Sequence, residues 1–176
     1  MISKSTPTLL ALMIGVALLA GVGSAQAGAP EPRKAVEVAR FLGRWYEFAH
    51  TPNARERACV AGSMEFSQTG PNRYALQQTC RKAGGGVQSV RAGAQFTDDR
   101  QHAKLDVLFF GGLIRSHYWV LDHDPDYRWA VVGTSGGRYV WILTREPHPP
   151  ADQAQAAKSA ARALGFDPAA LTYPPG

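Results

Sequence analysis

Cysteine is scarce in this chain of 176 residues, and its absence from the first 27 positions is informative. A lipid-anchored protein of the bacterial envelope needs a cysteine directly after its apolar leader, whereas the first cysteine here is Cys59. The apolar run from Leu9 to Val22 has only about 14 residues, and a membrane-spanning helix needs about 20. We therefore expect neither a lipid anchor nor a membrane span.

The motifs of common enzyme classes are not found in their usual setting. The one Gly-x-Ser-x-Gly match, at 133–137, lies in the turn expected between two strands and not between a strand and a helix, and the glycines at 84–86 are not followed by the Lys-Ser or Lys-Thr of a phosphate-binding loop. The histidines, at 50, 102, 117, 123 and 148, lack the spacing of a zinc site. His117, His123 and Asp124 offer at most a weak surface site, and a solvated loop is expected there. We expect no enzyme activity, no cofactor and no metal.

The first 27 residues have the features of a secretory signal peptide. Lys4 precedes the apolar run, and Ser24-Ala25-Gln26-Ala27 supplies the small residues of a cleavage site. We expect cleavage after Ala27, which leaves 28–176 as one periplasmic or secreted domain. Loss of Lys4 lowers the net charge from +5 to +4. Export argues against nucleic acid as the partner of this basic domain and favours an anionic membrane surface.

The two cysteines, Cys59 and Cys80, are expected to form a disulfide, because an even count in an oxidising compartment favours pairing. Such a bridge would stabilise the fold by about 3 kcal/mol. It would also remove the thiol that a cysteine nucleophile needs. Two unpaired buried thiols are the alternative.

Short segments of alternating polarity, separated by turn residues, occupy most of the domain. They predict strands at 44–50, 60–67, 73–80, 90–96, 105–109, 117–122, 129–133 and 138–145. A helix is predicted at 151–164, which is rich in helix formers and is followed by Gly165. This order predicts an all-β fold, an eight-stranded up-and-down antiparallel barrel with the helix packed outside. A β-sandwich is the alternative, because a period of two in the strands is common to sandwiches and barrels.

Three segments carry a resemblance to a known family. They are Gly43-Arg44-Trp45-Tyr46-Glu47, then Tyr118-Trp119-Val120-Leu121-Asp122 continuing through Asp126-Tyr127-Arg128-Trp129-Ala130-Val131, and finally Trp141-Ile142-Leu143-Thr144-Arg145. In this order they resemble the lipocalin family, and more narrowly the bacterial lipocalins of the outer-membrane lipoprotein type, which are similar to plant temperature-induced lipocalins and apolipoprotein D. The resemblance covers about 36–175 and implies a lipocalin calyx.

The resemblance also implies structural roles for Gly43, Trp45, Asp126, Tyr127 and Arg145. In the family, the arginine covers the tryptophan. A guanidinium over an indole contributes about 0.5 to 2 kcal/mol, and its donors can bond nearby carbonyls, which suits the seal at the narrow end of a barrel. This chain departs from the pattern at His123-Asp124-Pro125, where the family has a more compact turn, and in lacking the lipidation cysteine.

Matching the strand alternation to the inward face of the family predicts an apolar ligand site. Small residues on that face, Gly62 among them, are expected to leave volume unfilled, and Met64 provides an adaptable wall. Ordinary core packing is the alternative for any single residue. The predicted lining is Met64, Phe66, Ala92, Ala94, Leu105, Val107, Phe109, Tyr118, Val120, Tyr139 and Trp141.

These features predict a carrier for fatty acids, lysophospholipids or similar amphiphiles that supports maintenance of the envelope membrane; the lipid class is implied by the resemblance. An enzyme acting on a lipophilic substrate and a loop-based protein-binding or inhibitor module are alternatives. The sequence leaves open the natural ligand and whether the protein is a monomer or a homodimer. Basic residues near the loops could meet anionic headgroups or could serve solubility; they are Arg55, Arg57, Arg81, Lys82 and Arg115.

Overall fold

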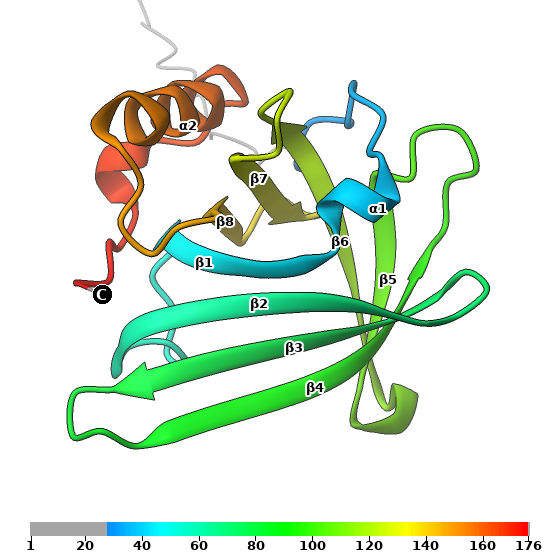
Figure 1. Cartoon of the computed structure of the whole chain (residues 1–176), viewed down its shortest axis with the longest axis horizontal. Helices are drawn as coiled ribbons and strands as arrows, with labels where there is room; N and C mark the ends of the chain where they lie inside the picture. Colours follow the sequence, from blue (N-terminus) through cyan, green and yellow to red (C-terminus); the bar gives the residue numbers. More distant parts are fainter. Residues whose placement is uncertain (1–27, 176) are drawn as a thin grey trace, which may run out of the picture.

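Eight antiparallel strands close into a barrel in the computed structural model, which describes residues 28–175 (Figure 1). Each strand pairs with the next along the chain, and β1 (Gly43–His50) also pairs with β8 (Val140–Thr144), so the sheet has no free edge. The predicted up-and-down barrel is confirmed and the sandwich alternative is wrong. The predicted signal peptide lies outside the described residues.

The other strands and the C-terminal helix follow the predicted order with small changes of length, and three short helical segments are additional. The strands are β2 (Cys59–Gly70), β3 (Arg73–Lys82), β4 (Val87–Phe96), β5 (Lys104–Phe109), β6 (Ile114–His123) and β7 (Trp129–Thr134). The helices are α1 (Val38–Phe41), α2 (Ala151–Ala163) and two 3-10 turns, η1 (Phe110–Gly112) and η2 (Pro168–Ala170). Of the helices in the described part of the chain, none is long and apolar enough to cross a membrane.

The last strand is shorter than predicted at both ends because neighbouring residues take other partners. The Tyr139 backbone N–H donates to the Thr134 hydroxyl, and the Tyr139 carbonyl accepts from the Thr134 N–H, so Tyr139 belongs to the turn before β8. At the other end, the Arg145 N–H donates to the Arg128 carbonyl. Its side chain is thereby placed over the narrow end of the barrel.

Trp45 and Arg145 seal that narrow end. The Trp45 side chain is fully buried, and its Nε1–H donates to the Phe41 carbonyl of α1 at 2.8 Å. The Arg145 guanidinium lies 3.6 Å above the indole centroid. It also donates to the carbonyls of Arg40, Phe41, Leu42, Arg44 and Tyr127. Gly43, with φ of 92°, takes a left-handed conformation that glycine adopts without strain, where the chain passes from α1 into β1.

The corner between β6 and β7 is held by Asp124. Its buried carboxylate accepts from the backbone N–H groups of Asp126 and Arg128 and from the Arg128 guanidinium. These donors hold the pKa of Asp124 below its usual value, with the Arg128 side chain as the largest cause. Asp126, which was assigned the structural role, has an exposed carboxylate whose ion pair with Arg40 is 3.9 Å long. Asp124 therefore holds the turn in this chain.

Tyr127 also stabilises the corner. Its ring stacks on His123 with centroids 4.4 Å apart, and its hydroxyl accepts from the Glu37 N–H at 2.7 Å. Its positive φ of 57° is held by these contacts. The corner thus ties the chain before α1 to the sealed end.

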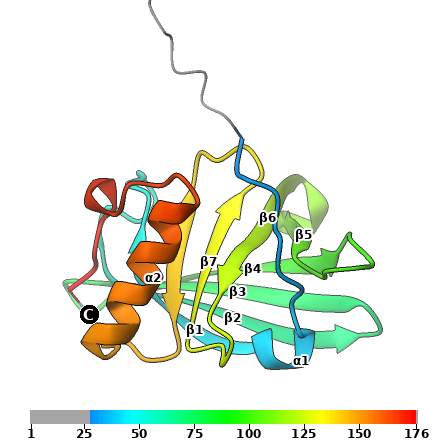
Figure 2. The ribbon, with the colours of Figure 1, turned by 90° about the horizontal axis from the view of Figure 1, so that it is seen from above.

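Helix α2 covers the outer face of β7 and β8, as Figure 2 shows. Ala157 and Ala161 are fully buried and pack against a second apolar cluster formed by Leu121, Val131 and Ile142, among others. The helix ends as predicted before Gly165, whose φ is 91° and whose N–H donates to the Arg162 carbonyl. Because α2 occupies the outside, β7 and β8 are buried on both faces.

Candidate functional site

The hollow of the barrel lies at the end opposite Trp45, among the loops at 51–58, 83–86, 110–113 and 135–139. Two adjoining cavities of about 340 and 530 Å³ occupy this open end. They share six lining residues from one loop, two strand positions and the β5 to β6 turn: Ala54, Arg55, Glu56, Gln78, Phe109 and Phe110. Volumes in this range are typical of small-molecule sites.

Four of the predicted lining residues meet at this end. Phe109, Tyr118, Tyr139 and Trp141 all line the smaller cavity. The rings of Tyr118 and Trp141 lie 5.3 Å apart, and those of Tyr139 and Trp141 6.3 Å apart. They form an aromatic wall with three polar groups, the two hydroxyls and the indole N–H.

The other predicted lining residues lie deeper, in a packed floor, and touch neither cavity. They belong to the same apolar cluster as Phe41, Trp45 and Leu76, and each is at most 5% exposed. Phe41 enters from α1 and packs 4.9 Å from Phe66. The expectation that alanines on this face leave space unfilled is wrong for the floor, which comprises Met64, Phe66, Ala92, Ala94, Leu105, Val107 and Val120.

Gly62 also serves a different purpose from the one predicted. A Cβ at this position would lie 2.1 Å from Oε2 of Glu47. The missing side chain therefore makes room for a buried carboxylate and not for an apolar ligand.

Sequence reasoning missed a polar cluster beside the aromatic wall, made of Glu47, His50 and Glu56. The side chains of Glu47 and His50 are 4% and 2% exposed. His50 Nδ1 lies 3.7 Å from Glu47 Oε2, and His50 Nε2 lies 3.6 Å from Glu56 Oε2. The Trp141 indole N–H donates to Glu56 Oε1 at 3.3 Å, which joins the cluster to the aromatic wall.

Local structure positions each member of this cluster. His50 closes β1 with two backbone hydrogen bonds to Thr172, which returns from the C-terminal segment. Asn53 Oδ1 accepts from the N–H groups of Arg55 and Glu56, and its amide donates to the Glu56 carboxylate. This Asx turn directs Glu56 toward the barrel.

Burial changes the acidity of these groups. Burial, together with the nearby Glu56 carboxylate, raises the pKa of Glu47 to about 8. Burial also lowers the pKa of His50, although Glu56 opposes the shift. The pKa of the Tyr118 hydroxyl is raised by burial and then by the two carboxylates. Glu47 and Tyr118 are therefore neutral hydrogen-bond donors near pH 7, and His50 is an uncharged imidazole.

The disulfide predicted between Cys59 and Cys80 is confirmed, with a Cα separation of 5.3 Å. It joins the start of β2 to β3 at the rim, and Cys80 lines the larger cavity. The loop at 51–58 leads directly into Cys59. The disulfide thus restrains the segment that carries Glu56.

The weak metal site considered at His117, His123 and Asp124 is not assembled. His117 Nδ1 pairs with Asp106 Oδ1 at 2.7 Å and is exposed. The ring nitrogens of His123 lie 3.0 and 3.1 Å from the carbonyls of Asp124 and Ala35. Six residues along β6 separate the two histidines by about 20 Å.

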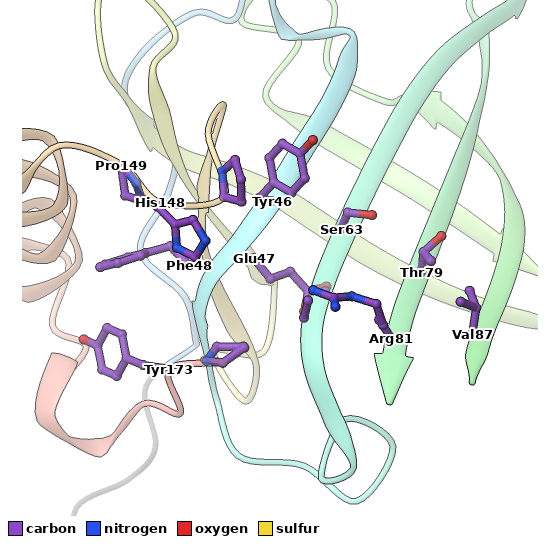
Figure 3. A pocket seen from close by; sticks show the side chains of 14 residues that line it. Tyr46, Glu47, Phe48, Ser63, Thr79, Arg81, Val87, His148, Pro149 and Tyr173 are labelled. Carbon is purple, nitrogen blue, oxygen red and sulfur yellow. The ribbon is translucent and has the colours of Figure 1, made fainter. Parts of the chain in front are cut away.

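A further groove, of about 620 Å³, lies outside the barrel (Figure 3). It runs between the outward side chains of the first four strands and the C-terminal segment. Its wall is mostly apolar, with Phe48, Val87, Pro147 and Tyr173 among its lining residues, and Arg81 is the one basic side chain in it besides His148. This groove is the alternative site for an apolar ligand, on the outer face of the barrel.

The family model described as a lipocalin-like domain matches residues 36–176. The chain is 30% identical to temperature-induced lipocalin-1 of Arabidopsis thaliana over 121 residues, and the match spans 64% of each protein, just under two thirds of the plant relative's length. It is 32% identical to outer membrane lipoprotein Blc of Citrobacter freundii over 136 residues, covering 67% of this chain and 70% of Blc.

Among solved structures, insecticyanin from the tobacco hornworm Manduca sexta has the same fold. The TM-score is 0.67, and the alignment covers 84% of this chain and 86% of insecticyanin. The sequences are 15% identical, so this likeness concerns architecture alone.

Proposed function

Because the chain belongs to the lipocalin family, we propose that it binds a fatty acid, a lysophospholipid or a similar amphiphile and carries or stores it for envelope membrane maintenance. The acyl chain enters the cavity at the open end, against Phe109 and the aromatic wall. The single observation that carries this proposal is that this cavity lies inside the barrel and is walled by Phe109, Tyr118, Tyr139 and Trp141. Burial of the chain against these rings supplies about 25 cal/mol per Å².

We propose a binding role for this site. Both cysteines are held in the disulfide, so the chain offers no thiol nucleophile. The polar groups beside the cavity, the Tyr118 and Tyr139 hydroxyls and Arg55, suit an anionic or hydroxylated headgroup at the mouth.

Titration with oleate by calorimetry tests the ligand proposal. Phe109→Ala and Trp141→Ala are each expected to weaken oleate binding by about 10-fold or more, because a buried aromatic side chain contributes about 1.5 to 3 kcal/mol. Phe48→Ala is the matched control, since Phe48 lines the outer groove and not the cavity; its affinity should equal that of the wild type. Circular dichroism checks that each variant is folded. Unchanged affinity in both cavity variants would rule out the proposed site.

We also propose that the open end contacts anionic membrane surfaces. The turn between β5 and β6 exposes Phe110, Leu113 and Ile114, at 64%, 85% and 42%. Arg55 and Lys82 line the cavity mouth next to Phe110. Apolar side chains beside basic ones suit the surface of a bilayer that contains anionic lipids.

Sedimentation with phosphatidylglycerol vesicles tests this contact. Leu113→Asp is expected to reduce the bound fraction several-fold, because the aspartate adds a negative charge and removes an apolar contact. Thr69→Asp adds the same charge on the exposed end of β2, at the sealed end, and should bind as the wild type does. Equal loss in both variants would mean that net charge alone governs binding.

The location is proposed from the leader and from the bacterial relative. The protein is exported, the leader is removed after Ala27, and the domain is released into the periplasm or the medium. N-terminal sequencing of the exported protein should begin at Gly28; retention of the leader would contradict this.

A further inference from the structure

The polar cluster at the open end places two glutamates around one imidazole without a lysine or arginine partner in the part of the chain that the structure describes. Within residues 28–175, neither Glu47 nor Glu56 forms an ion pair with lysine or arginine; the one basic partner of each is His50. Arg55 lines the same cavity but is exposed. Glu56 is 16% exposed and accepts hydrogen bonds from Asn53 and Trp141, whereas Glu47 is only 4% exposed. A buried carboxyl group is normally paired, protonated or bound to a metal, because removing its charge from water is costly.

The imidazole of His50 also lacks a partner for one of its nitrogens. Its Nδ1 is buried and has no hydrogen-bond partner among the described residues. The ring cannot easily turn away, because His50 is 1% exposed and its backbone is fixed by Thr172. Orphaned buried nitrogens are rare in folded proteins, and each has a cause.

The spacing of the donor atoms suits a small cation better than hydrogen bonds. His50 Nδ1 lies 3.7 Å from Glu47 Oε2 and Nε2 lies 3.6 Å from Glu56 Oε2, and both distances exceed those of hydrogen bonds. A single ion can bind only one of the two nitrogens, so only the distance from that nitrogen is one between ligands. Ligands about 2.1 Å from a tetrahedral zinc ion lie about 3.4 Å from one another. One donor atom from each of Glu47, His50 and Glu56 lies within 4.8 Å of the others, so small side-chain movements would close the site.

We propose that Glu47, His50 and Glu56 form a binding site for a divalent transition-metal ion, with Zn²⁺ as the best match. One imidazole nitrogen and two carboxylates are ligand types that zinc accepts, and the ion's charge of +2 neutralises both carboxylates. Nδ1, the unpartnered atom beside Glu47, is the ring nitrogen assigned to the ion, and the Glu56 carboxylate, which lies beside Nε2, must turn toward Nδ1 to join it.

The site would have an open coordination position. Three protein ligands leave one tetrahedral position vacant, and Glu47 and Glu56 both line the larger cavity. The open position therefore faces the hollow of the barrel. Metal binding at this site is independent of lipid binding and is tested with the metal alone.

Calorimetric titration of chelator-treated, untagged protein with ZnCl₂ tests the site. The wild type is expected to bind one Zn²⁺ per chain. Glu47→Gln and His50→Gln are each expected to weaken binding by at least about 100-fold, because each removes a ligand from the ion. His117→Gln is the matched control, since it alters the exposed His117 and Asp106 pair and should leave the affinity unchanged.

Two further measurements distinguish loss of the metal site from loss of the fold. Zn²⁺ should raise the melting temperature of the wild type and of His117→Gln but not of Glu47→Gln, which separates loss of the site from loss of the fold. Co²⁺ in place of Zn²⁺ should give the intense visible absorption of a tetrahedral site. Absence of stoichiometric binding to the wild type would mean that protons alone neutralise the cluster and would overturn the proposal. Loss of binding in His117→Gln only would assign the ion to the surface and would do the same.

Discussion

Arg145→Ala is expected to lower the free energy of unfolding by about 3 to 5 kcal/mol, measured by urea denaturation. The guanidinium donates to five backbone carbonyls and covers the Trp45 indole at 3.6 Å. Charge-assisted hydrogen bonds contribute about 1.5 to 3 kcal/mol each and the cation–π contact about 0.5 to 2, but these terms do not add in full. Burial lowers the pKa of Arg145 to about 10, so the group is still charged at pH 7.

Two further variants separate the causes of this effect. Arg145→Lys keeps the charge but loses the planar fork, and we expect an intermediate loss of stability. Arg138→Ala is the control, because Arg138 also lies over an aromatic ring but is exposed. Its guanidinium is 5.2 Å from the centroid of the Tyr139 ring. That change should stay within about 0.5 kcal/mol of the wild type. A stable Arg145→Ala protein would show that the seal does not depend on this residue.

Asp124→Asn is expected to destabilise the protein by about 2 kcal/mol at pH 7, again by urea denaturation. The variant keeps the size of the side chain but loses the negative charge that accepts from two backbone N–H groups and from the Arg128 guanidinium. The adjacent Asp126→Asn is the control, because that carboxylate is exposed. It should change stability by less than about 0.5 kcal/mol.

The effect of Asp124→Asn should depend on pH. The pKa of Asp124 is lower in the folded protein than its ordinary value of 3.8. Its stabilisation is therefore complete above that value and is lost as the pH falls through the lowered folded-state pKa. The difference between wild type and Asp124→Asn should shrink as the pH falls below 3.8. A constant difference from pH 7 to pH 2.5 would mean that the carboxylate charge does not hold the corner.

The barrel could be predicted from the sequence because the patterns that specify it are local. Period-two alternation determines which face of each strand is buried, and the turn residues between the strands determine their order. The contact between Trp45 and Arg145 joins residues far apart in the sequence, and only the family resemblance predicted it. Asp124 was recognised only as a departure at the corner, and its role became clear from its hydrogen bonds.

The position of an inward-facing residue along the barrel axis could not be predicted from this alternation. Alternation shows that Val107 and Phe109 share a face but not that one lies in the packed floor and the other beside the cavity. The floor is filled partly by Phe41, which comes from a short helix that the strand pattern did not reveal.

The polar cluster was hidden by a strand irregularity. Residues three apart on a regular strand point to opposite faces, so Glu47 and His50 were not expected together. The register of β1 against β8 shifts between Glu47 and Ala49, which brings Glu47 and His50 together. Glu56 comes from a loop, where no periodicity applies. The one available signal was a glutamate at an inward position, two residues after Trp45.

A crystal structure of the protein with a bound lysophospholipid tests the central claim most directly. We predict electron density for the acyl chain inside the barrel, in contact with Phe109, Tyr118 and Trp141, above an unchanged floor. An acyl chain lying in the outer groove of Figure 3, or an empty cavity at saturating ligand, would contradict the account.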